Sequence, residues 1–249
     1  MLRKIKRKLY KVWSLYGPVG AVIQIATYPY TIIRDLAIAR RRNTVQAEFD
    51  REFNVDTAGL ISLSSLDVDS PNWEHGINYG PTSPASFAAV MGAISALSID
   101  LSDFTFIDFG SGKGAVLLYA AAFPFKDIIG VEFSSHLHQI AQSNIARHPL
   151  ASCRRVRSIL CDASQFEIPG GPLLTFFNRP FTNPLMDSVL SNIRASLRYS
   201  PRLAYVCTIR VDDNLRDLAS GDFLSVVGEG VSQDKVNYRI YVSGILSGT

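Results

Sequence analysis

Cysteine is scarce in this 249-residue sequence, which contains three. Cys153, Cys161 and Cys207 have neither the spacing of a metal site nor that of a disulfide framework. Free thiols are typical of a reducing compartment, so we expect a cytoplasmic protein that uses no metal site.

The sequence also lacks a clean membrane-spanning stretch. The stretch between Lys11 and Arg34 contains no charged residue and is long enough to cross a bilayer. However, Pro18 and Pro29 interrupt it. A secretory signal peptide is not expected either, because the charged start is long and Asp35 helps to interrupt the only small-residue cleavage site. Internal repeats and low-complexity tracts are missing too.

Positive charge is concentrated at the N-terminus. Residues 1–42 contain ten Lys or Arg and one acid, so this segment carries a charge of +9. Because the net charge of the whole chain is +3, the remaining residues carry −6. Residues 5–16 place apolar side chains on one helical face and basic ones on the other. This favours an anionic surface as partner, either a membrane or nucleic acid. Three alternatives stay open for the segment: helices packed on the domain, peripheral helices on a membrane, or a span.

The rest of the chain is organised around a glycine-rich turn. An aromatic and β-branched run, residues 104–109, has the composition of a buried parallel strand. Gly110, Gly112 and Gly114 follow at alternate positions, with Ser111 between the first two, and an apolar run at 115–122 predicts a helix. The free N–H groups at the start of such a helix face a ligand. A P-loop would need a glycine at Ile107, and a dinucleotide fingerprint needs a different glycine spacing.

Acidic residues follow the predicted second and third strands. Glu132 lies 22 residues beyond Gly110 at the end of 127–133, where a carboxylate can accept hydrogen bonds from the ribose hydroxyls of an adenosine. Phe133 could then lie against the adenine face. Asp162, after the strand 156–160, is the expected partner of the adenine amino group, with the N–H of Ala163 meeting a ring nitrogen. The alternative for Asp162 is a turn cap before Ser164.

The alternation of strands and helices predicts the fold class. Further strands are expected at 173–177 and 203–208, with an antiparallel pair at 222–227 and 236–242. Helices are expected at 85–97, at 135–147 and from Asn183, the last with Asn183 as its cap. His136 and His138 on the second helix are expected to be solvated. These elements make an α/β protein with a Rossmann-like, doubly wound seven-stranded sheet and an N-terminal helical extension.

Three regions are expected along the chain. Residues 1–53 form the basic extension, which ends in a helix whose Val45, Phe49 and Phe53 dock on the domain. Residues 54–103 form a loop and helix that lead into the core at 104–249. The turn-rich segment 75–84 should lie over the carboxyl ends of the strands. Tyr79 within it is predicted to contact the cofactor, and a surface turn with Tyr79 packed beneath it is the alternative.

The turn with its acids resembles the first motifs of class I S-adenosylmethionine-dependent methyltransferases. The match runs from Asp108 through the three glycines, continues with Glu132 and Asp162, and ends with Asn178 before Pro180-Phe181. The resemblance implies S-adenosylmethionine as cofactor, with Asp108 and the glycines holding its methionine part. Glu132 would hold the ribose, Asp162 the adenine, and Asn178 would line the methyl-transfer channel.

Within that class, the chain looks like the protein-lysine methyltransferases that lack a SET domain. This implies methyl transfer to a nitrogen, of protein lysine or another amine, with Asn178 orienting the nucleophile. Arg179 departs from the motif, which commonly has Pro after the Asn. The alternatives are a degenerate scaffold of the same fold, a methyltransferase acting on an oxygen of a small molecule with His75 as base, or an NAD-dependent oxidoreductase.

Overall fold

The computed structural model describes residues 43–66, 68, 70, 72–210 and 223–243. The chain divides into two compact units, residues 1–44 and 45–249. Residues 1–42 of the basic extension lie outside the described residues, so the helices expected there are not among the elements below. The last part of the extension, residues 43–53, is described and helical. Among the described helices, none is long and apolar enough to cross a bilayer.

The second unit is built on one sheet whose strands run in the order β3-β2-β1-β4-β5-β7-β6. Neighbouring strands from β3 to β5 are parallel, whereas β7 runs antiparallel to both β5 and β6. This confirms the predicted seven-stranded, doubly wound sheet. The strands are β1 Thr105–Phe109, β2 Asp127–Glu132, β3 Val156–Leu160, β4 Leu173–Phe177, β5 Ala204–Ile209, β6 Leu224–Val231 and β7 Asn237–Ser243.

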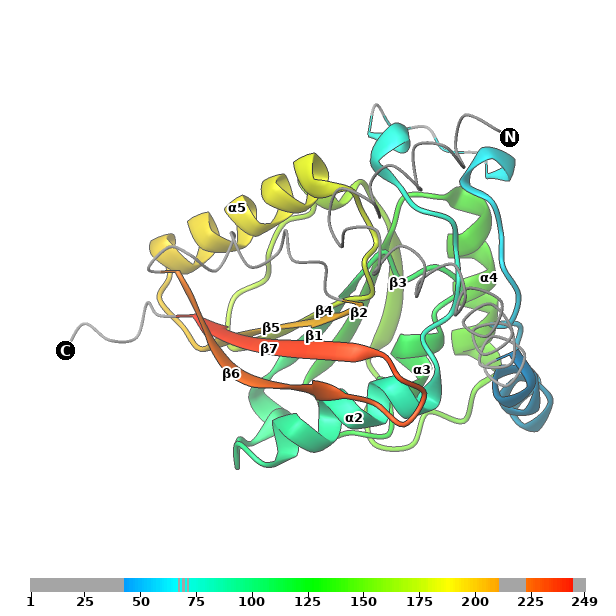
Figure 1. Cartoon of the computed structure of the whole chain (residues 1–249), viewed down its shortest axis with the longest axis horizontal. Coiled ribbons are helices and arrows are strands. Elements are labelled where there is room, and N and C mark those ends of the chain that lie inside the picture. The colour runs from blue at the N-terminus through cyan, green and yellow to red at the C-terminus, as the bar shows by residue number, and fades with distance from the viewer. Residues whose placement is uncertain (1–42, 67, 69, 71, 211–222, 244–249) are drawn as a thin grey trace, which may run out of the picture. The chain divides into compact units, whose positions relative to one another are not determined.

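Helices cover both faces of the sheet (Figure 1). They are α2 Pro84–Ser95, α3 Ala115–Ala120, α4 Ser135–Arg147 and α5 Asn183–Tyr199. In Figure 1, α5 lies over one face, and α2 and α3 lie under the other. The crossovers from β1 to β2 and from β4 to β5 run in opposite directions along the sheet, and right-handed connections therefore place α3 and α5 on opposite faces.

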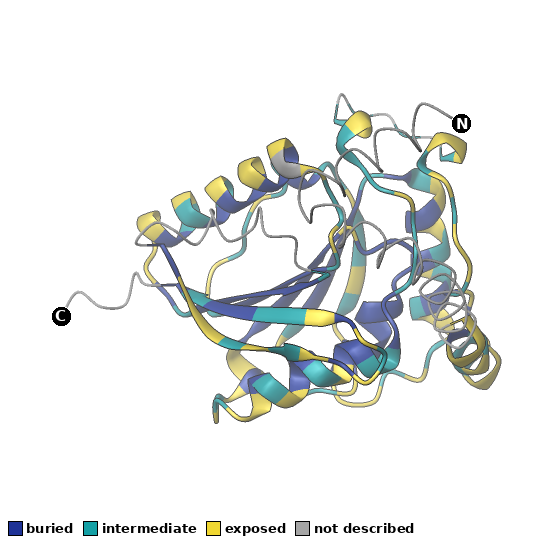
Figure 2. Cartoon of the chain, viewed as in Figure 1, coloured by how far each residue is buried: buried dark blue, intermediate teal, exposed yellow. Residues whose placement is uncertain are grey.

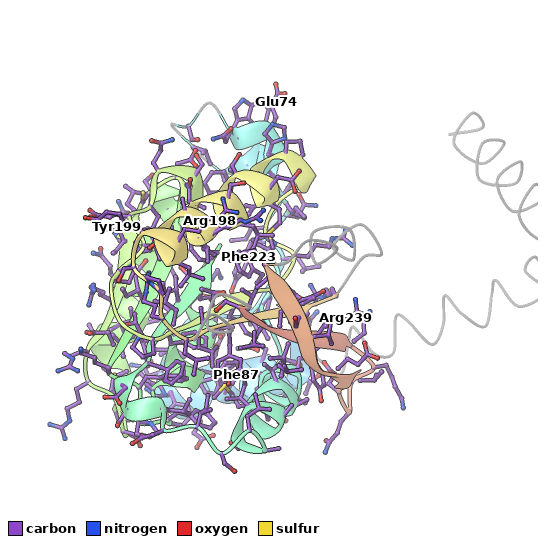
Figure 3. The ribbon with its side chains drawn as sticks, turned by 90° about the vertical axis from the view of Figure 1, so that its left-hand side faces the viewer. Glu74, Phe87, Arg198, Tyr199, Phe223 and Arg239 are labelled. Carbon is purple, nitrogen blue, oxygen red and sulfur yellow. The ribbon has the colours of Figure 1, made fainter. Side chains whose placement is uncertain are left out.

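The alternation of side chains along each strand builds two hydrophobic cores. Phe106 and Phe176 pack against α2 and α3 on one face of the sheet. Phe109 and Phe177 lie on the other face and pack beneath α5. The central strands are buried throughout, whereas α5 exposes its outer face (Figure 2). Figure 3 shows this division of side chains: Phe87 of α2 lies among the core side chains, and Tyr199 at the end of α5 points into solvent.

The register of the strands brings three loops to one edge of the sheet. Phe109 of β1 pairs with Val131 of β2 on one side and with Phe177 of β4 on the other. The residues that follow these strands therefore lie at the same level. Between β1 and β4 the chain order reverses, which is where open α/β sheets bind ligands.

Three local predictions were wrong. Val45 is exposed, so of the three residues expected to dock on the domain only Phe49 and Phe53 make ring contacts there, with Tyr119 and His148.

Thr182, with extended backbone, is the N-cap of α5, and Asn183 is its first helical residue. His138 is buried, with Nδ1 2.8 Å from the hydroxyl of Ser158, because it faces β3 rather than solvent. Burial lowers the pKa of His138 from its ordinary value. His136 is exposed, as expected.

Candidate active site

The glycine turn after β1 has a backbone that other residues would adopt only under strain. Gly110, Gly112 and Gly114 have φ angles of +76°, +54° and +83°. Two neighbouring segments also approach it closely: a Cβ on Gly110 would lie 2.4 Å from Cβ of Pro180, and one on Gly112 would lie 2.3 Å from Cε2 of Tyr79. Glycine is therefore required both by the turn and by its neighbours. Gly114 ends the turn as the N-cap of α3.

Two carboxylates lie beside this turn and are 97% buried. Glu132 accepts the N–H of Gly112 at Oε2 and the N–H of Ser134 at Oε1, each at 2.8 Å. Asp108, like Glu132, is only 3% exposed.

Burial sets the protonation of both groups. It raises the pKa of Glu132 to about 7, and the backbone N–H groups of Ser134, Gly112 and Phe133 oppose the rise. Burial also raises the pKa of Asp108 well above its usual range, and the nearby charge of Glu132 raises it further. Two buried carboxylates in the same pocket wall repel each other when both are charged. A cationic ligand bound between them would stabilise their charged forms.

An open pocket of about 640 Å³ lies at the switch point, with solvent at its mouth included in that volume. Eight of the predicted site residues line it: Tyr79, Asp108, Gly110, Ser111, Gly112, Glu132, Phe133 and Asn178. They come from the last residues of β1 and β2, from the loops after β1, β2 and β4, and from the turn-rich segment before α2.

Tyr79 forms part of the pocket wall. Its hydroxyl donates to the carbonyl of Thr57 at 2.6 Å, and its ring lies against Gly112. The ammonium group of Lys113 lies 5.7 Å from the ring centroid. The segment at 75–84 therefore lies over the strand ends, with Tyr79 directed inward rather than into solvent.

Asn178, immediately after β4, presents an unsatisfied acceptor. Its Nδ2 donates to the hydroxyl of Thr82 at 2.8 Å, whereas its buried Oδ1 has no partner among the described residues. The buried hydroxyl of Ser111 is likewise without a partner there. Both residues line the pocket, and buried polar atoms normally have hydrogen-bond partners, so a bound ligand is a natural partner for them.

Asp162 and Ala163 line a smaller, adjoining cavity together with Phe133 and Gly110. The carboxylate of Asp162 accepts hydrogen bonds from Ser70 and Asn72, and it caps the turn through Ser164. These bonds lower its pKa from the usual value, although burial acts in the opposite direction as the largest single cause. The cap that the alternative expected is thus present, and an adenine contact stays a prediction.

Arg179 lies between Asn178 and Pro180 in the loop after β4. It is exposed and has a φ of +43°, an uncommon conformation for a residue with a side chain. It lines both the main pocket and a second, mostly apolar pocket of about 920 Å³ on the side of α5. The second pocket also shares Ile77, Pro180 and Phe181 with the first.

Sequence reasoning missed Thr82, which lines the pocket, and a group of polar residues next to the pocket. Thr82 anchors Asn178, and Lys113 binds the carboxylate of Asp56 at 2.7 Å. The amide of Asn144 bonds the backbone of Asp56 and of Lys113. A polar Asn within the apolar stripe of a helix, and a Lys within a glycine turn, were the signals in the sequence.

Comparison with known proteins supports the fold assignment. No protein-family model and no curated protein matches the sequence. The magnesium protoporphyrin IX methyltransferase of Synechocystis PCC 6803, solved with bound S-adenosylmethionine, has a TM-score of 0.50 and 13% identity over 64% of this chain and 79% of its own. The human methyltransferase 10 domain containing protein has a TM-score of 0.50 and 13% identity over 84% of this chain and 97% of its own.

The fold is therefore that of the class I S-adenosylmethionine-dependent methyltransferases. At 13% identity the similarity concerns the fold, and the activity has to be inferred from the site residues of this chain.

Proposed function

We propose that this protein is an S-adenosylmethionine-dependent methyltransferase that transfers a methyl group directly to a nitrogen. The observation that carries the proposal is the pocket at the switch point, in which two buried carboxylates adjoin a glycine turn and the free acceptor of Asn178. Protein lysine is the acceptor that the sequence resemblance favours, and other amines are its alternatives.

The charge of the pocket fits the proposed cofactor. S-adenosylmethionine carries an ammonium and a sulfonium, and Asp108 and Glu132 supply negative charge where water is largely excluded. Asp108 and the turn would hold the methionine part, and Glu132 the ribose hydroxyls. The unpartnered hydroxyl of Ser111 offers one further polar contact.

The free oxygen of Asn178 supports a nitrogen as the acceptor atom. S-adenosylmethionine supplies a methyl group already activated by its sulfonium, so the protein mainly has to position a neutral nucleophile. Because Thr82 accepts the Nδ2–H of Asn178, the amide is fixed and Oδ1 is left to accept an N–H. An amine held in this way directs its lone pair at the methyl carbon. As the carbon–nitrogen bond forms, the carbon–sulfur bond breaks and its electron pair stays on sulfur, which gives S-adenosylhomocysteine and a methylated ammonium product without a general base.

An oxygen acceptor would require a general base. His75 was the residue that the sequence offered for that role. Its Nδ1 lies 3.0 Å from the hydroxyl of Thr182, and its side chain is outside the lining of the main pocket. The geometry thus favours the nitrogen acceptor.

Two experiments test the proposal. Equilibrium dialysis with S-adenosylmethionine should show binding of one molecule per chain, and a protein that does not bind would be a scaffold of the same fold. Incubation of cell extract with radiolabelled methyl donor, followed by separation of protein, nucleic acid, lipid and small molecules, should show where the label goes. Label stable to alkaline treatment supports a nitrogen acceptor over a carboxyl oxygen.

We further propose a cytoplasmic protein that residues 1–42 bring to an anionic surface. The support is the sequence charge of +9 in this segment and the free thiols of the three cysteines.

A further inference from the structure

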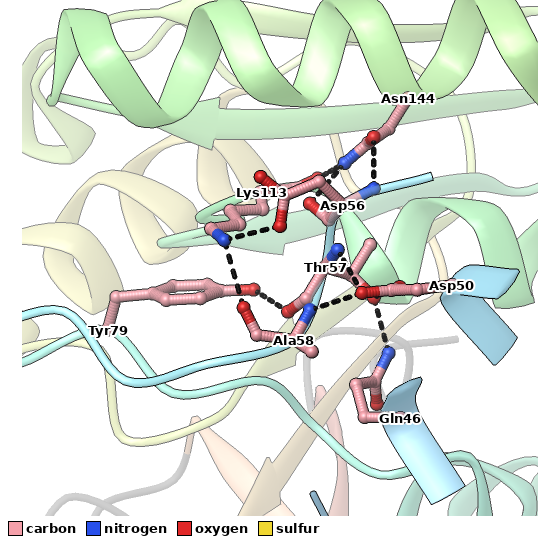
Figure 4. A network of polar contacts seen from close by, with 8 residues as sticks. All are labelled: Gln46, Asp50, Asp56, Thr57, Ala58, Tyr79, Lys113 and Asn144. Carbon is pink, nitrogen blue, oxygen red and sulfur yellow. Dashed lines mark hydrogen bonds and ion pairs between the residues drawn. The ribbon is translucent and has the colours of Figure 1, made fainter. Parts of the chain in front are cut away.

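A network of polar contacts lies behind the pocket wall (Figure 4). It joins the helical residues 45–53, the segment that follows them, the glycine turn and α4. Its members are Gln46, Asp50, Asp56, Thr57, Ala58, Tyr79, Lys113 and Asn144. Of these, only Tyr79 lines the main pocket.

Asp50 holds the first link of this network. One oxygen of its carboxylate accepts the N–H of Thr57 at 2.9 Å and the N–H of Ala58 at 2.8 Å. The other oxygen accepts the hydroxyl of Thr57, which also accepts an N–H from Gln46. Hydrogen bonds to a carboxylate are among the stronger ones in proteins, and Thr57 is completely buried. Asp50 therefore fixes the direction of the backbone at 57–58.

The carbonyl groups of this backbone hold two side chains. The carbonyl of Thr57 accepts the hydroxyl of Tyr79 at 2.6 Å, and the carbonyl of Ala58 accepts the ammonium of Lys113 at 2.9 Å. Figure 4 shows both side chains reaching the segment from the opposite side to Asp50. The orientation set by Asp50 is thus passed on to Tyr79 and Lys113.

Both residues are connected to the glycine turn, Tyr79 by packing against it and Lys113 as one of its residues. The Tyr79 ring packs against Gly112 so closely that a Cβ there would overlap it. Lys113 follows Gly112 in the chain, and Gly112 in turn donates its N–H to Glu132. Asp50 is thereby connected to the pocket through two parallel routes without touching it.

We propose that Asp50 is a positioning residue for the cofactor, acting through Thr57 and Ala58 on Tyr79 and Lys113. The inference rests on the proposed function. It makes residues 45–58 part of the cofactor-binding apparatus, although they lie far before the glycine turn in the sequence.

The test compares the affinities of two variants for S-adenosylmethionine by calorimetry. Asp50→Asn keeps the shape of the side chain, but it removes the charge and replaces one of the two accepting oxygens by an NH2 group. We expect its Kd for S-adenosylmethionine to rise about tenfold. Glu52→Gln removes an exposed carboxylate from the same helical segment, and we expect its Kd to stay within twofold. An Asp50→Asn variant that is folded and has an unchanged Kd overturns the inference.

A double-mutant cycle separates positioning from general support of the fold. Tyr79→Phe removes the hydroxyl that Thr57 holds, so it should also raise Kd, and the pair with Asp50→Asn should raise it by less than the product of the single effects. A merely structural role would lower the melting temperature without changing the Kd of the folded protein. Independent, multiplicative effects overturn the proposed route through Tyr79.

The outcomes also distinguish this inference from the proposed function. If the unmodified protein does not bind S-adenosylmethionine, the proposed function fails and the inference fails with it. If it binds and Asp50→Asn binds equally well, only the inference fails. Should Asp50→Asn not fold, Tyr79→Phe decides alone, and an unchanged Kd for that variant counts against the inference.

Discussion

Glu132 and Asp108 place two carboxyl groups in the wall of the pocket. Each is almost fully buried, and burial is the main reason why both have raised pKa values. A carboxylate kept in such a place without a ligand lowers stability, which is a common property of functional sites. The predicted cation would offset this cost.

The raised pKa of Glu132, about 7, predicts a pH-dependent affinity. Below that pH the carboxyl is protonated and loses its charge, so the Kd for S-adenosylmethionine should fall as the pH rises from 5.5 to 7.5. The range ends there because an α-amino group loses its own proton at about pH 7.7–8.0. Calorimetry at several pH values measures this, and a Kd that is constant or rises across the range contradicts it.

Gly112 predicts a second effect at the residue scale. Gly112→Ala adds a Cβ that would overlap the Tyr79 ring, and its positive φ costs roughly 1–2 kcal/mol. We expect the Kd for S-adenosylmethionine to rise at least tenfold, with a modest fall in stability.

Gly92→Ala is the matched control. Gly92 lies within α2, and a Cβ there meets nothing within 4 Å. Alanine at this position should stabilise the protein by about 0.5–1 kcal/mol in urea unfolding and leave Kd unchanged. Equal Kd values for the two variants would disprove a cofactor role for the turn.

The site residues divide by the kind of information that identifies them. Asp108, Glu132 and the glycines could be predicted because their spacing follows from one strand–turn–helix–strand unit. Thr82 could not, because its contact with Asn178 joins segments that are distant in sequence. Asp50 could not either, because its own contacts are local and its connection to the glycine turn runs through the long-range contacts of Tyr79 and Lys113. The hydrogen bonds that Asp162 accepts from Ser70 and Asn72 likewise depend on a loop whose path no local pattern encodes. Its two bonds from Ser164 are the local turn cap that the sequence offered.

At the scale of elements, the packing of helices on the sheet holds the three strand-end loops in register. Phe87 of α2 is 2% exposed and packs against Phe106, Phe176 and Tyr119. α3 has six residues, all buried, so it follows directly from the apolar run in the sequence. The predicted helix and strand ends shifted by one or two residues, except that β6 continues to Val231, four residues beyond its predicted end.

Phe87→Ala should therefore destabilise the protein strongly. Loss of a fully buried aromatic ring costs about 3–5 kcal/mol, whereas Tyr199→Ala, at a site that is 94% exposed, should cost less than about 0.5 kcal/mol. Urea unfolding measures both (positions in Figure 3). Similar costs for the two would contradict the assignment of α2 to the core.

At the scale of the whole molecule, charge predicts where the protein acts. Residues 1–42 carry +9, and we expect the full chain to float with vesicles containing an anionic lipid, while a chain lacking these residues does not. The binding should weaken as salt is raised, because screening shortens the reach of the charges. Equal flotation of both chains would remove the proposed role of the segment.

The central claim is that the pocket binds S-adenosylmethionine with its ribose at Glu132. The most direct measurement is a crystal structure of the protein grown with S-adenosylhomocysteine. We predict that the nucleoside fills the pocket and that its ribose hydroxyls lie within hydrogen-bond distance of the Glu132 carboxylate. A pocket that stays empty, or a ribose held by other residues, would contradict the account.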